Sequence, residues 1–336
     1  MAYSCTKPDC TVAVTRKCLL LHEPCETCPN YEATESPGTD GGAPENHGEA
    51  PTGQEHCVAR RFFPGFELGT DNATEIMRGN YGTLIAILGP YDVGKTCFLS
   101  SLYLMTGARA IGPDLAFAGS LTLNGFEARA RRLREWKKGA LPKQLADHTI
   151  LSDDRAASLM HLALRERSDT CRRFDLLVTD LPGEWSTDLV KDAGTADRFH
   201  FLKRADAIVV ALDGPLLLGH ERHAAVHDAK MLLTRLSDTV QVDRSIPLIL
   251  MVTKCDQLGM KAPPAVATIA SHAKSAGFDP KVILIAAVSR SPQDVKSGTG
   301  VMDVIEHVLD RKREPQPRPI KPDRKVSSRN FARIRG

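Results

Sequence analysis

The stretch GPYDVGKT (89–96) decides the fold, because it lies between the apolar run LIAIL (84–88) and the helix-like run CFLSSLYLM (97–105). It fits G-x-x-x-x-G-K-[ST], in which backbone N–H groups and a helix N-terminus cradle phosphate oxygens. Lys95 is expected to reach the β- and γ-phosphates, and Thr96 to give a hydroxyl to Mg²⁺. The predicted phosphate-binding residues are Gly89, Asp92, Val93, Gly94, Lys95, Thr96 and Cys97.

Apolar runs and helix-like runs alternate after this loop. Besides 84–88, the runs that predict buried strands are RADAIVVALD (204–213), IPLILMVTK (246–254) and KVILIAAVS (281–289). Besides 97–105, the helix-like runs are 220–238, 264–277 and 299–313. Alternation of this kind predicts an open α/β sheet with mostly parallel strands.

One part of the chain breaks the alternation. SLMHLALRE (158–166) and FDLLVTD (174–180) are separated by only seven residues, which leaves no room for a helix. They are expected to form a hairpin, and so to add one antiparallel edge strand. The long segment 107–157 before them contains a basic amphipathic pattern, FEARARRLREWKKGAL (126–141), that predicts a helix.

DLPGE (180–184) follows the apolar strand FDLLV. Asp180, at the carboxyl end of that strand, is expected to hold Mg²⁺ through a water. Gly183 is expected to offer its N–H to the γ-phosphate at a point where no side chain fits. The pattern D-x-x-G is common in ordinary turns. Here it follows the hairpin that comes after the phosphate loop and its helix, and that position favours a contact with the γ-phosphate.

TKCD (253–256) follows the buried run LILMV. The carboxylate of Asp256 can accept two hydrogen bonds from the N1–H and the exocyclic amine of guanine, which adenine does not offer. Lys254 is expected to lie along the base. VSR (288–290) follows the last strand, and the backbone N–H of Ser289 is expected to help close the base pocket.

The order of GPYDVGKT, DLPGE, TKCD and VSR resembles the translation-factor-related class of P-loop GTPases, over about residues 80–312. The hairpin resembles the Ras-like sheet, whose second strand is antiparallel. With DLAFAGSLTLNGFEARA (114–130) and a Cys-rich N-terminus, the chain most resembles the bacterial double-GTPase group. That resemblance implies a Ras-like P-loop NTPase fold and a role in multi-gene bacterial systems of conflict or defence.

The resemblance also implies a threonine beside the γ-phosphate that reaches Mg²⁺. Thr122 is the preferred residue for this role, and Thr106 and Ser120 are its rivals.

The sequence departs from the Ras-like pattern at two positions. Glu184 stands where a glutamine normally orients the attacking water, and its charge opposes the γ-phosphate. Lys95 and Glu184 are therefore the predicted catalytic residues, with Glu184 either slowing hydrolysis, acting on the water or pointing away. Thr253 replaces an asparagine that ties the base loop to the phosphate loop, so a weaker tie is expected.

The N-terminus is rich in cysteine, with five in its first 28 residues. A segment this short cannot bury a core, so the pattern predicts one structural zinc ion with four ligands. Cys5, Cys10 and Cys28 are preferred, and Cys18, His22 and Cys25 compete for the fourth place. The alternatives are a metal-free tail and a redox dithiol at CETC.

Composition divides the chain into a zinc-knuckle-like module (1–30), a Pro- and Gly-rich linker (31–56), a lead-in (57–80), a GTPase domain (81–313) and a basic tail (314–336). Residues 311–336 hold ten Lys or Arg against two acidic residues, although the net charge of the chain is only +3. A tail of this kind suits nucleic acid or an anionic membrane, but a solubilising role is favoured. The absence of a long apolar run or signal-like N-terminus favours a cytoplasmic protein.

These motifs predict Mg²⁺-dependent hydrolysis of GTP to GDP and phosphate, and a switch that acts on a protein partner or a second GTPase. Two alternatives stay open. One is a GTP-binding scaffold that hydrolyses little, which Glu184 favours. The other is an ATPase or nucleotide kinase, which the TKCD sequence disfavours.

Overall fold

The computed structural model describes residues 2–5, 27–34, 65–79, 82–134, 158–168 and 171–310. By its internal contacts the chain divides into two units, Met1–Arg60 and Arg61–Gly336. In the first unit, β1 (Ala2–Cys5) pairs antiparallel with β2 (Tyr31–Thr34), so that Cys5 lies opposite Tyr31.

The second unit is built on a seven-stranded sheet with the order β4-β5-β6-β3-β7-β8-β9. The strands are β3 (Gly82–Leu88), β4 (Leu115–Gly119), β5 (Leu159–Glu166), β6 (Arg173–Thr179), β7 (Ala207–Asp213), β8 (Leu248–Thr253) and β9 (Pro280–Leu284). From β6 to β9 all neighbouring strands are parallel. The predicted α/β sheet, parallel for most of its width, is confirmed.

The antiparallel part of the sheet differs from the prediction in one respect. β5 pairs antiparallel with β6, as the hairpin predicted, but it is not the edge strand. β4 pairs antiparallel with β5 on its outer side and forms the edge. The sheet does have an antiparallel part, but the expectation that residues 158–166 form its edge was wrong. The edge strand LAFAG was missed because it is only five residues long and only partly buried.

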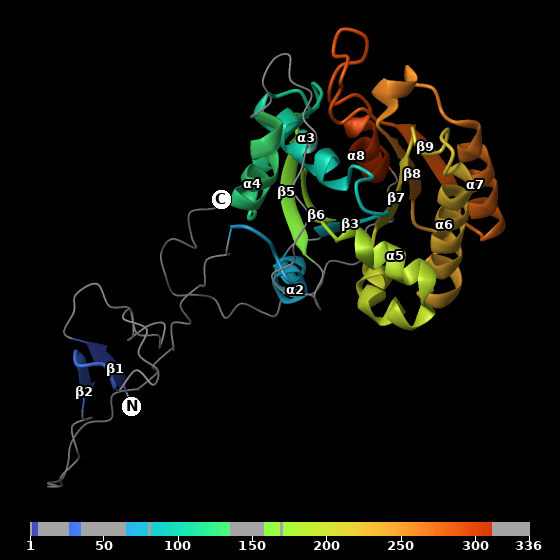
Figure 1. The fold of residues 1–336 in the computed structure, drawn as a ribbon. Coiled ribbons are helices and arrows are strands. Elements are labelled where there is room, and N and C mark those ends of the chain that lie inside the picture. Colours follow the sequence, from blue (N-terminus) through green and yellow to red (C-terminus); the bar gives the residue numbers. More distant parts are fainter. Residues whose placement is uncertain are drawn as a thin grey trace, which may run out of the picture. The chain divides into compact units, whose positions relative to one another are not determined.

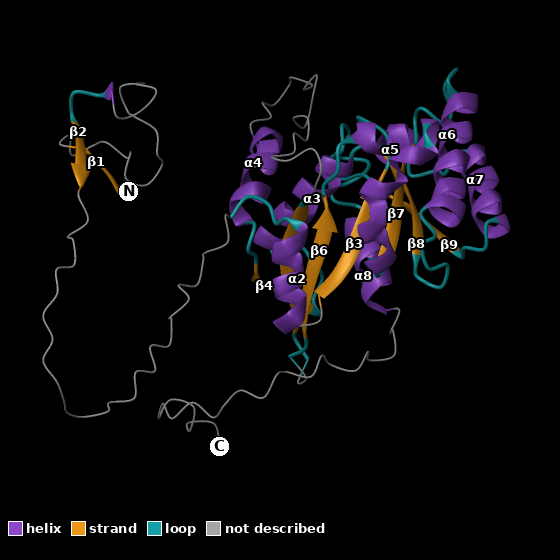
Figure 2. Ribbon diagram, turned by 90° about the horizontal axis from the view of Figure 1, so that it is seen from below, coloured by secondary structure: helices purple, strands orange, loops and turns teal. Residues whose placement is uncertain are grey.

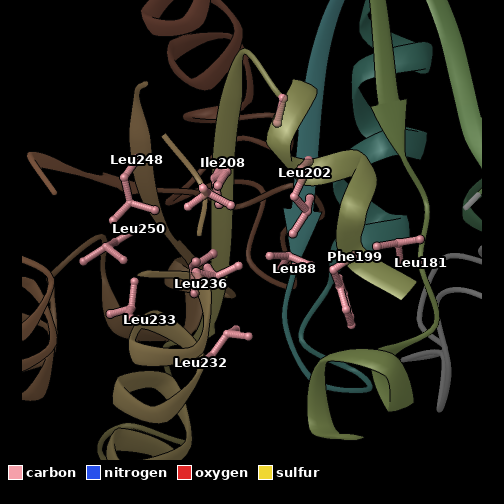
Figure 3. Close-up of a cluster of buried hydrophobic side chains, with 14 of the residues drawn as sticks. Leu88, Leu181, Phe199, Leu202, Ile208, Leu232, Leu233, Leu236, Leu248 and Leu250 are labelled. Atoms are coloured by element: carbon pink, nitrogen blue, oxygen red, sulfur yellow. The ribbon is translucent and has the colours of Figure 1, made fainter. Parts of the chain in front are cut away.

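Helices cover both faces of the sheet and bury its central strands (Figures 1 and 2). One face packs against α2 (Thr70–Gly79), α5 (Gly183–Lys191), α6 (Arg222–Thr234) and α7 (Pro264–Ser275). The other packs against α3 (Lys95–Gly107), α4 (Leu123–Arg134) and α8 (Val301–Asp310). Figure 3 shows the first core, in which Leu88 and Ile208 of the sheet lie among leucines of the covering helices. Burial on both faces explains why these strands read as unbroken apolar runs.

Several elements differ in extent from the sequence prediction. The helix expected at 126–141 begins earlier, at Leu123, and its predicted second half lies outside the described residues. The last strand ends at Leu284 because the chain then turns and Ala286 pairs with Thr299. Helices α2, α5 and the 3₁₀ helix η2 (Ala193–Arg204) were not predicted. None of the helices in the described ranges has the length and apolar character needed to span a bilayer.

Candidate functional site

The loop between β3 and α3 has the conformation of an anion cradle. Asp92 and Gly94 adopt left-handed φ values of 57° and 96°. Gly94 is the N-cap of α3, and no side chain caps this helix end. The first turn of α3 also carries no acidic residue. Its first N–H groups therefore have no intrahelical acceptor, which makes this helix end suited to phosphate oxygens.

Lys95 lies in this cradle with its amine turned back onto the loop. Its Nζ donates to the carbonyl oxygens of Gly89 at 2.8 Å and Pro90 at 2.9 Å. Burial lowers the pKa of Lys95 to about 8, although the charges of Asp180 and Glu184 oppose the shift. A buried ammonium group that donates to two carbonyl oxygens and lies near two carboxylates is suited to gain an anionic ligand.

Cys97 and Val93 support the loop sterically. Val93 is fully buried behind it. Burial raises the pKa of the Cys97 thiol to about 11, so this thiol is protonated and inert at neutral pH. What these positions offer a ligand is therefore their backbone N–H groups.

The segment after β6 closes against the phosphate loop. Gly183 opens α5, and an added Cβ there would lie 2.2 Å from Tyr91 N and 2.4 Å from Tyr91 Cα. No side chain fits at this position, because the phosphate loop itself blocks it. The predicted contact between Gly183 N–H and the γ-phosphate stays a prediction. The Ser186 hydroxyl of α5 also accepts a hydrogen bond from Gly89 N–H at 3.0 Å. Glu184 is exposed in the first turn of α5.

Asp180 lies at the carboxyl end of the sheet and is almost fully buried, with 1% of its side chain exposed. Its Oδ2 accepts a hydrogen bond from Arg129 Nε at 2.5 Å, and Arg129 in turn binds Glu67 at 2.7 Å. The carboxylate of Asp180 and the hydroxyl of Thr96 at the start of α3 are hard oxygen donors of the kind that Mg²⁺ prefers. The donor set therefore fits Mg²⁺. With the ion bound, the carboxylate of Asp180 would interact with both Mg²⁺ and the guanidinium of Arg129.

The hydroxyl groups predicted to reach Mg²⁺ before the hairpin are engaged elsewhere in this structure. Thr122 is fully buried, and its Oγ1 accepts from His161 N–H at 2.9 Å. Ser120 Oγ donates to the His161 carbonyl at 2.6 Å. Thr106 Oγ1 donates to Tyr103 O within α3. Ser120 and Thr122 thus fix the start of α4 to β5, and the Mg²⁺ role of Thr122 stays a prediction.

Lys254 joins the base loop to the phosphate loop. Its Nζ lies 3.1 Å from Asp92 Oδ2 and 2.8 Å from Asp213 Oδ2. Burial acts to lower the pKa of Lys254, but the two carboxylates outweigh it and raise that pKa. Thr253 donates its hydroxyl to Leu212 O at 3.1 Å, so it does not make the tie that an asparagine would make. The ion pairs of Lys254 supply that connection instead.

Asp256 is held with one oxygen engaged and one oxygen open. Its Oδ2 accepts from Arg290 N–H at 2.9 Å. Its Oδ1 is buried and has no hydrogen-bond partner among the described residues. A buried carboxylate oxygen without a partner is costly, which indicates that a ligand completes the site. Ser289 N–H donates to Ser297 Oγ at 3.0 Å, so Arg290 rather than Ser289 contacts the aspartate.

Most of the zinc candidates lie outside the described residues. Cys10, Cys18, His22 and Cys25 are outside the described residues, and only the backbone of Cys5 is described. Cys28 is buried and within 4.0 Å of Asn30 Nδ2. Among the described residues there is no cluster of three or more His, Cys, Asp or Glu that could hold a metal.

Four residues of this site were missed by the sequence prediction: Glu67, Arg129, Asp213 and Arg290. Asp213 carries a readable signal, because it is the polar end of the run RADAIVVALD, as Asp180 is of FDLLVTD. Arg129 lies in a helix rich in arginine, and the pattern does not single it out.

Comparison with known proteins assigns the chain to a family. A family model described as Double-GTPase 2 matches residues 83–309, from the start of β3 to the last turn of α8. No curated protein matches the chain. Among solved structures, a crystal structure of a mutation variant of SsGBP is 13% identical with a TM-score of 0.35. The match covers 70% of this chain and 57% of that structure.

Proposed function

This chain belongs to the Double-GTPase 2 family, and from that premise we propose that it binds GTP with Mg²⁺ and hydrolyses it to GDP and phosphate. The switch role that follows is part of the proposal: a γ-phosphate orders the segments around Asp180 and α4, and its loss releases them. The segment after β6 meets the phosphate loop at Gly183, and α4 is joined to that segment through Arg129 and Asp180.

The observation that carries the proposal is the open oxygen of Asp256. Guanine presents two neighbouring donors, N1–H and the exocyclic amine, and Asp256 Oδ1 is a buried acceptor with no partner in the described part of the chain. Arg290 N–H fixes the other oxygen and so fixes the plane of the carboxylate. Adenine has no donor at N1 and would leave the acceptor unpaired. A site built around a polar group rejects the analogue that lacks its partner strongly.

At the other end of the site, each residue has a separate task. Lys95 and the first-turn N–H groups of α3 bind phosphate oxygens. Thr96 and Asp180 would hold Mg²⁺, which when bound offsets phosphate charge. Glu184 is exposed in the first turn of α5 and within electrostatic range of Lys95, and in this proposal it faces the attacking water.

The proposal is tested by direct binding and by single-turnover hydrolysis. The full chain is expected to bind GTP and GDP in preference to ATP, and to release phosphate from GTP only with Mg²⁺. Lys95→Ala should abolish GTP binding and leave helix content unchanged, whereas Lys261→Ala, at an exposed lysine, should behave as wild type. Equal affinity for ATP and GTP would contradict the proposal.

A GTP-binding scaffold with little intrinsic hydrolysis is the second candidate. It is favoured by Glu184, since a carboxylate can only accept a hydrogen bond and repels the γ-phosphate. Both candidates predict GTP binding, and single-turnover hydrolysis without any partner separates them. The ATPase or kinase alternative is disfavoured by Asp256, because adenine cannot satisfy its open oxygen.

The biological setting also remains a proposal. The family description suggests a second GTPase as the protein partner, and we place the pair in a bacterial conflict or defence system. Lys95→Ala and a hydrolysis-deficient form would hold the protein in its empty and GTP-bound states. A partner retained by one state and not by the other supports a switch, and equal retention counts against it.

We further propose that residues 1–30 bind one zinc ion. The pairing of β1 with β2 supports this, because Cys5 lies opposite Tyr31 and Tyr31 N–H donates to Cys28 O at 2.9 Å. The backbones of Cys5 and Cys28, two of the preferred ligands that are distant in sequence, therefore both lie beside Tyr31. Metal analysis should return one zinc per chain, lost on deletion of 1–30 with GTP binding kept. Metal-free protein purified under reducing conditions would contradict this assignment.

A further inference from the structure

Arg129 lies between two carboxylates that come from distant parts of the chain. Its Nε donates to Asp180 at the end of β6, and its Nη2 donates to Glu67 in the segment before α2. Its Nη1 donates to the carbonyl oxygen of Gly125 at 3.1 Å, one turn earlier in α4. The side chain is only 14% exposed. These three acceptors hold the arginine in one defined conformation, which is not expected of an exposed surface arginine.

Backbone contacts hold all three segments in place. Leu68 exchanges two backbone hydrogen bonds of 3.0 Å with Leu159, which pairs with Thr179, the residue before Asp180. On α4, a Cβ added at Gly125 would lie 1.9 Å from Phe66 O, so only glycine permits this approach. Arg129 is therefore fixed by main-chain packing at the phosphate end of the site.

The guanidinium also lies where positive charge is needed. Asp180, which it binds, is close enough to Lys95 to raise the pKa of that lysine. Glu67, Asp180 and Glu184 bring three negative charges to this end of the site, against Lys95 and Arg129. An arriving triphosphate adds more. Three of the five N–H groups of Arg129 bind described residues, which leaves two for a further acceptor.

We propose that Arg129 is the arginine that this chain itself supplies to the γ-phosphate during hydrolysis, and that Glu67 and Asp180 hold it ready for that contact. The proposal rests on the proposed function. In the reaction, the oxygen of a water bonds to the γ-phosphorus while the bond to the bridging β–γ oxygen breaks. The electron pair leaves with GDP, and one proton of the water passes to the released phosphate. Arg129 stabilises the negative charge that grows on the phosphate oxygens.

The test separates the transition state from the ground state. Wild type, Arg129→Ala, Arg129→Lys and Arg131→Ala are titrated with GDP and Mg²⁺, with and without aluminium fluoride, which mimics the transferring phosphoryl group. Arg131 is an exposed arginine on the same helix and is the matched control. Single-turnover GTP hydrolysis by the same four forms is the second readout.

Wild type and Arg131→Ala should bind GDP with aluminium fluoride more tightly than GDP alone, without any partner protein. Arg129→Ala should keep its GDP affinity within about tenfold, lose the gain from aluminium fluoride, and hydrolyse GTP about 10²–10³-fold more slowly. Arg129→Lys keeps the charge without the planar fork, so its gain from aluminium fluoride and its hydrolysis rate should lie between those of wild type and Arg129→Ala. If Arg129→Ala does not fold, Arg129→Lys provides the test.

An undiminished aluminium fluoride complex in Arg129→Ala would overturn the proposal. So would faster hydrolysis by that variant at lower Mg²⁺, since Arg129 would then compete with Mg²⁺ for Asp180. Failure of the wild type to bind GDP would instead overturn the proposed function, and this inference with it.

Discussion

Lys254 and Asp92 form an ion pair of 3.1 Å that joins the base loop to the phosphate loop, and Lys254 also pairs with Asp213 at 2.8 Å. The two carboxylates differ in exposure: the side chain of Asp92 is 76% exposed and that of Asp213 is 16% exposed. Exposed ion pairs contribute little free energy. Asp213, the more buried partner, should therefore hold Lys254 more strongly than Asp92 does.

Asp213→Asn should therefore weaken GTP binding more than Asp92→Asn. We expect about a tenfold rise in Kd for Asp213→Asn, which corresponds to about 1.4 kcal/mol, and little change for Asp92→Asn. Titration calorimetry of both variants measures the difference. Equal losses in the two variants would show that the exposed pair matters as much as the buried one.

Gly183→Ala should disturb the phosphate loop without removing any ligand-binding side chain. The new Cβ meets the backbone of Tyr91, which cannot move aside as a flexible side chain can. We expect a loss of GTP affinity together with a lower Tm, since overpacking typically costs about 1–3 kcal/mol. Gly107→Ala is the matched control, because an added Cβ at this end of α3 meets nothing within 4 Å. A variant with unchanged affinity would contradict the close approach of Gly183 to the loop.

The affinity for GTP should fall as the pH rises through about 8. Lys95 loses its proton there in the free protein, and bound phosphates favour the charged form. Since its pKa in the folded protein is below that in the unfolded chain, its burial destabilises the free protein less as the pH rises from about 8 to 10.5. Glu184→Gln removes a charge that raises the pKa of Lys95, so its curve should shift to lower pH.

Binding curves from about pH 7 to about pH 9 measure this effect. Protonation changes of the guanine ring affect wild type and Glu184→Gln equally. The difference between their two curves therefore reports the protonation of Lys95. Superimposable curves would show that Glu184 does not act on this lysine.

Glu184→Gln should also raise basal GTP turnover. A neutral amide can both donate and accept, and it no longer repels the γ-phosphate. We expect about a tenfold faster single turnover at saturating Mg²⁺, equal to about 1.4 kcal/mol of activation free energy. Asp188→Asn, one turn further along α5, is the control. Fast wild-type hydrolysis that slows in Glu184→Gln would instead make Glu184 a catalytic base.

The parts of this account that the sequence predicted are those with local signals. The run from LIAIL through GPYDVGKT to CFLSSLYLM predicts a strand, a loop and a helix, because apolar periodicity and glycine spacing are local. The short edge strand β4 and helix α5 have weaker patterns and were missed.

The contacts that shape the site are long-range and were not predictable. Arg129 is 62 residues from Glu67 and 51 from Asp180, and nothing in its arginine-rich helix distinguishes it. Likewise, Arg290 N–H on Asp256 is a backbone contact that any side chain would permit. Such contacts depend on strand order and loop conformation, which a residue pattern does not encode.

The most direct test of guanine recognition is the nucleotide preference of Asp256→Asn. Asparagine offers an N–H₂ group where Asp256 offers an acceptor, and xanthine carries a carbonyl where guanine carries an amine. Competition titrations with the triphosphates of guanosine, xanthosine and adenosine should show GTP favoured by the wild type and by Asp294→Asn, an exposed control. In Asp256→Asn, GTP should weaken by at least about tenfold while the xanthine nucleotide gains. A variant that keeps the wild-type preference for GTP would contradict the account.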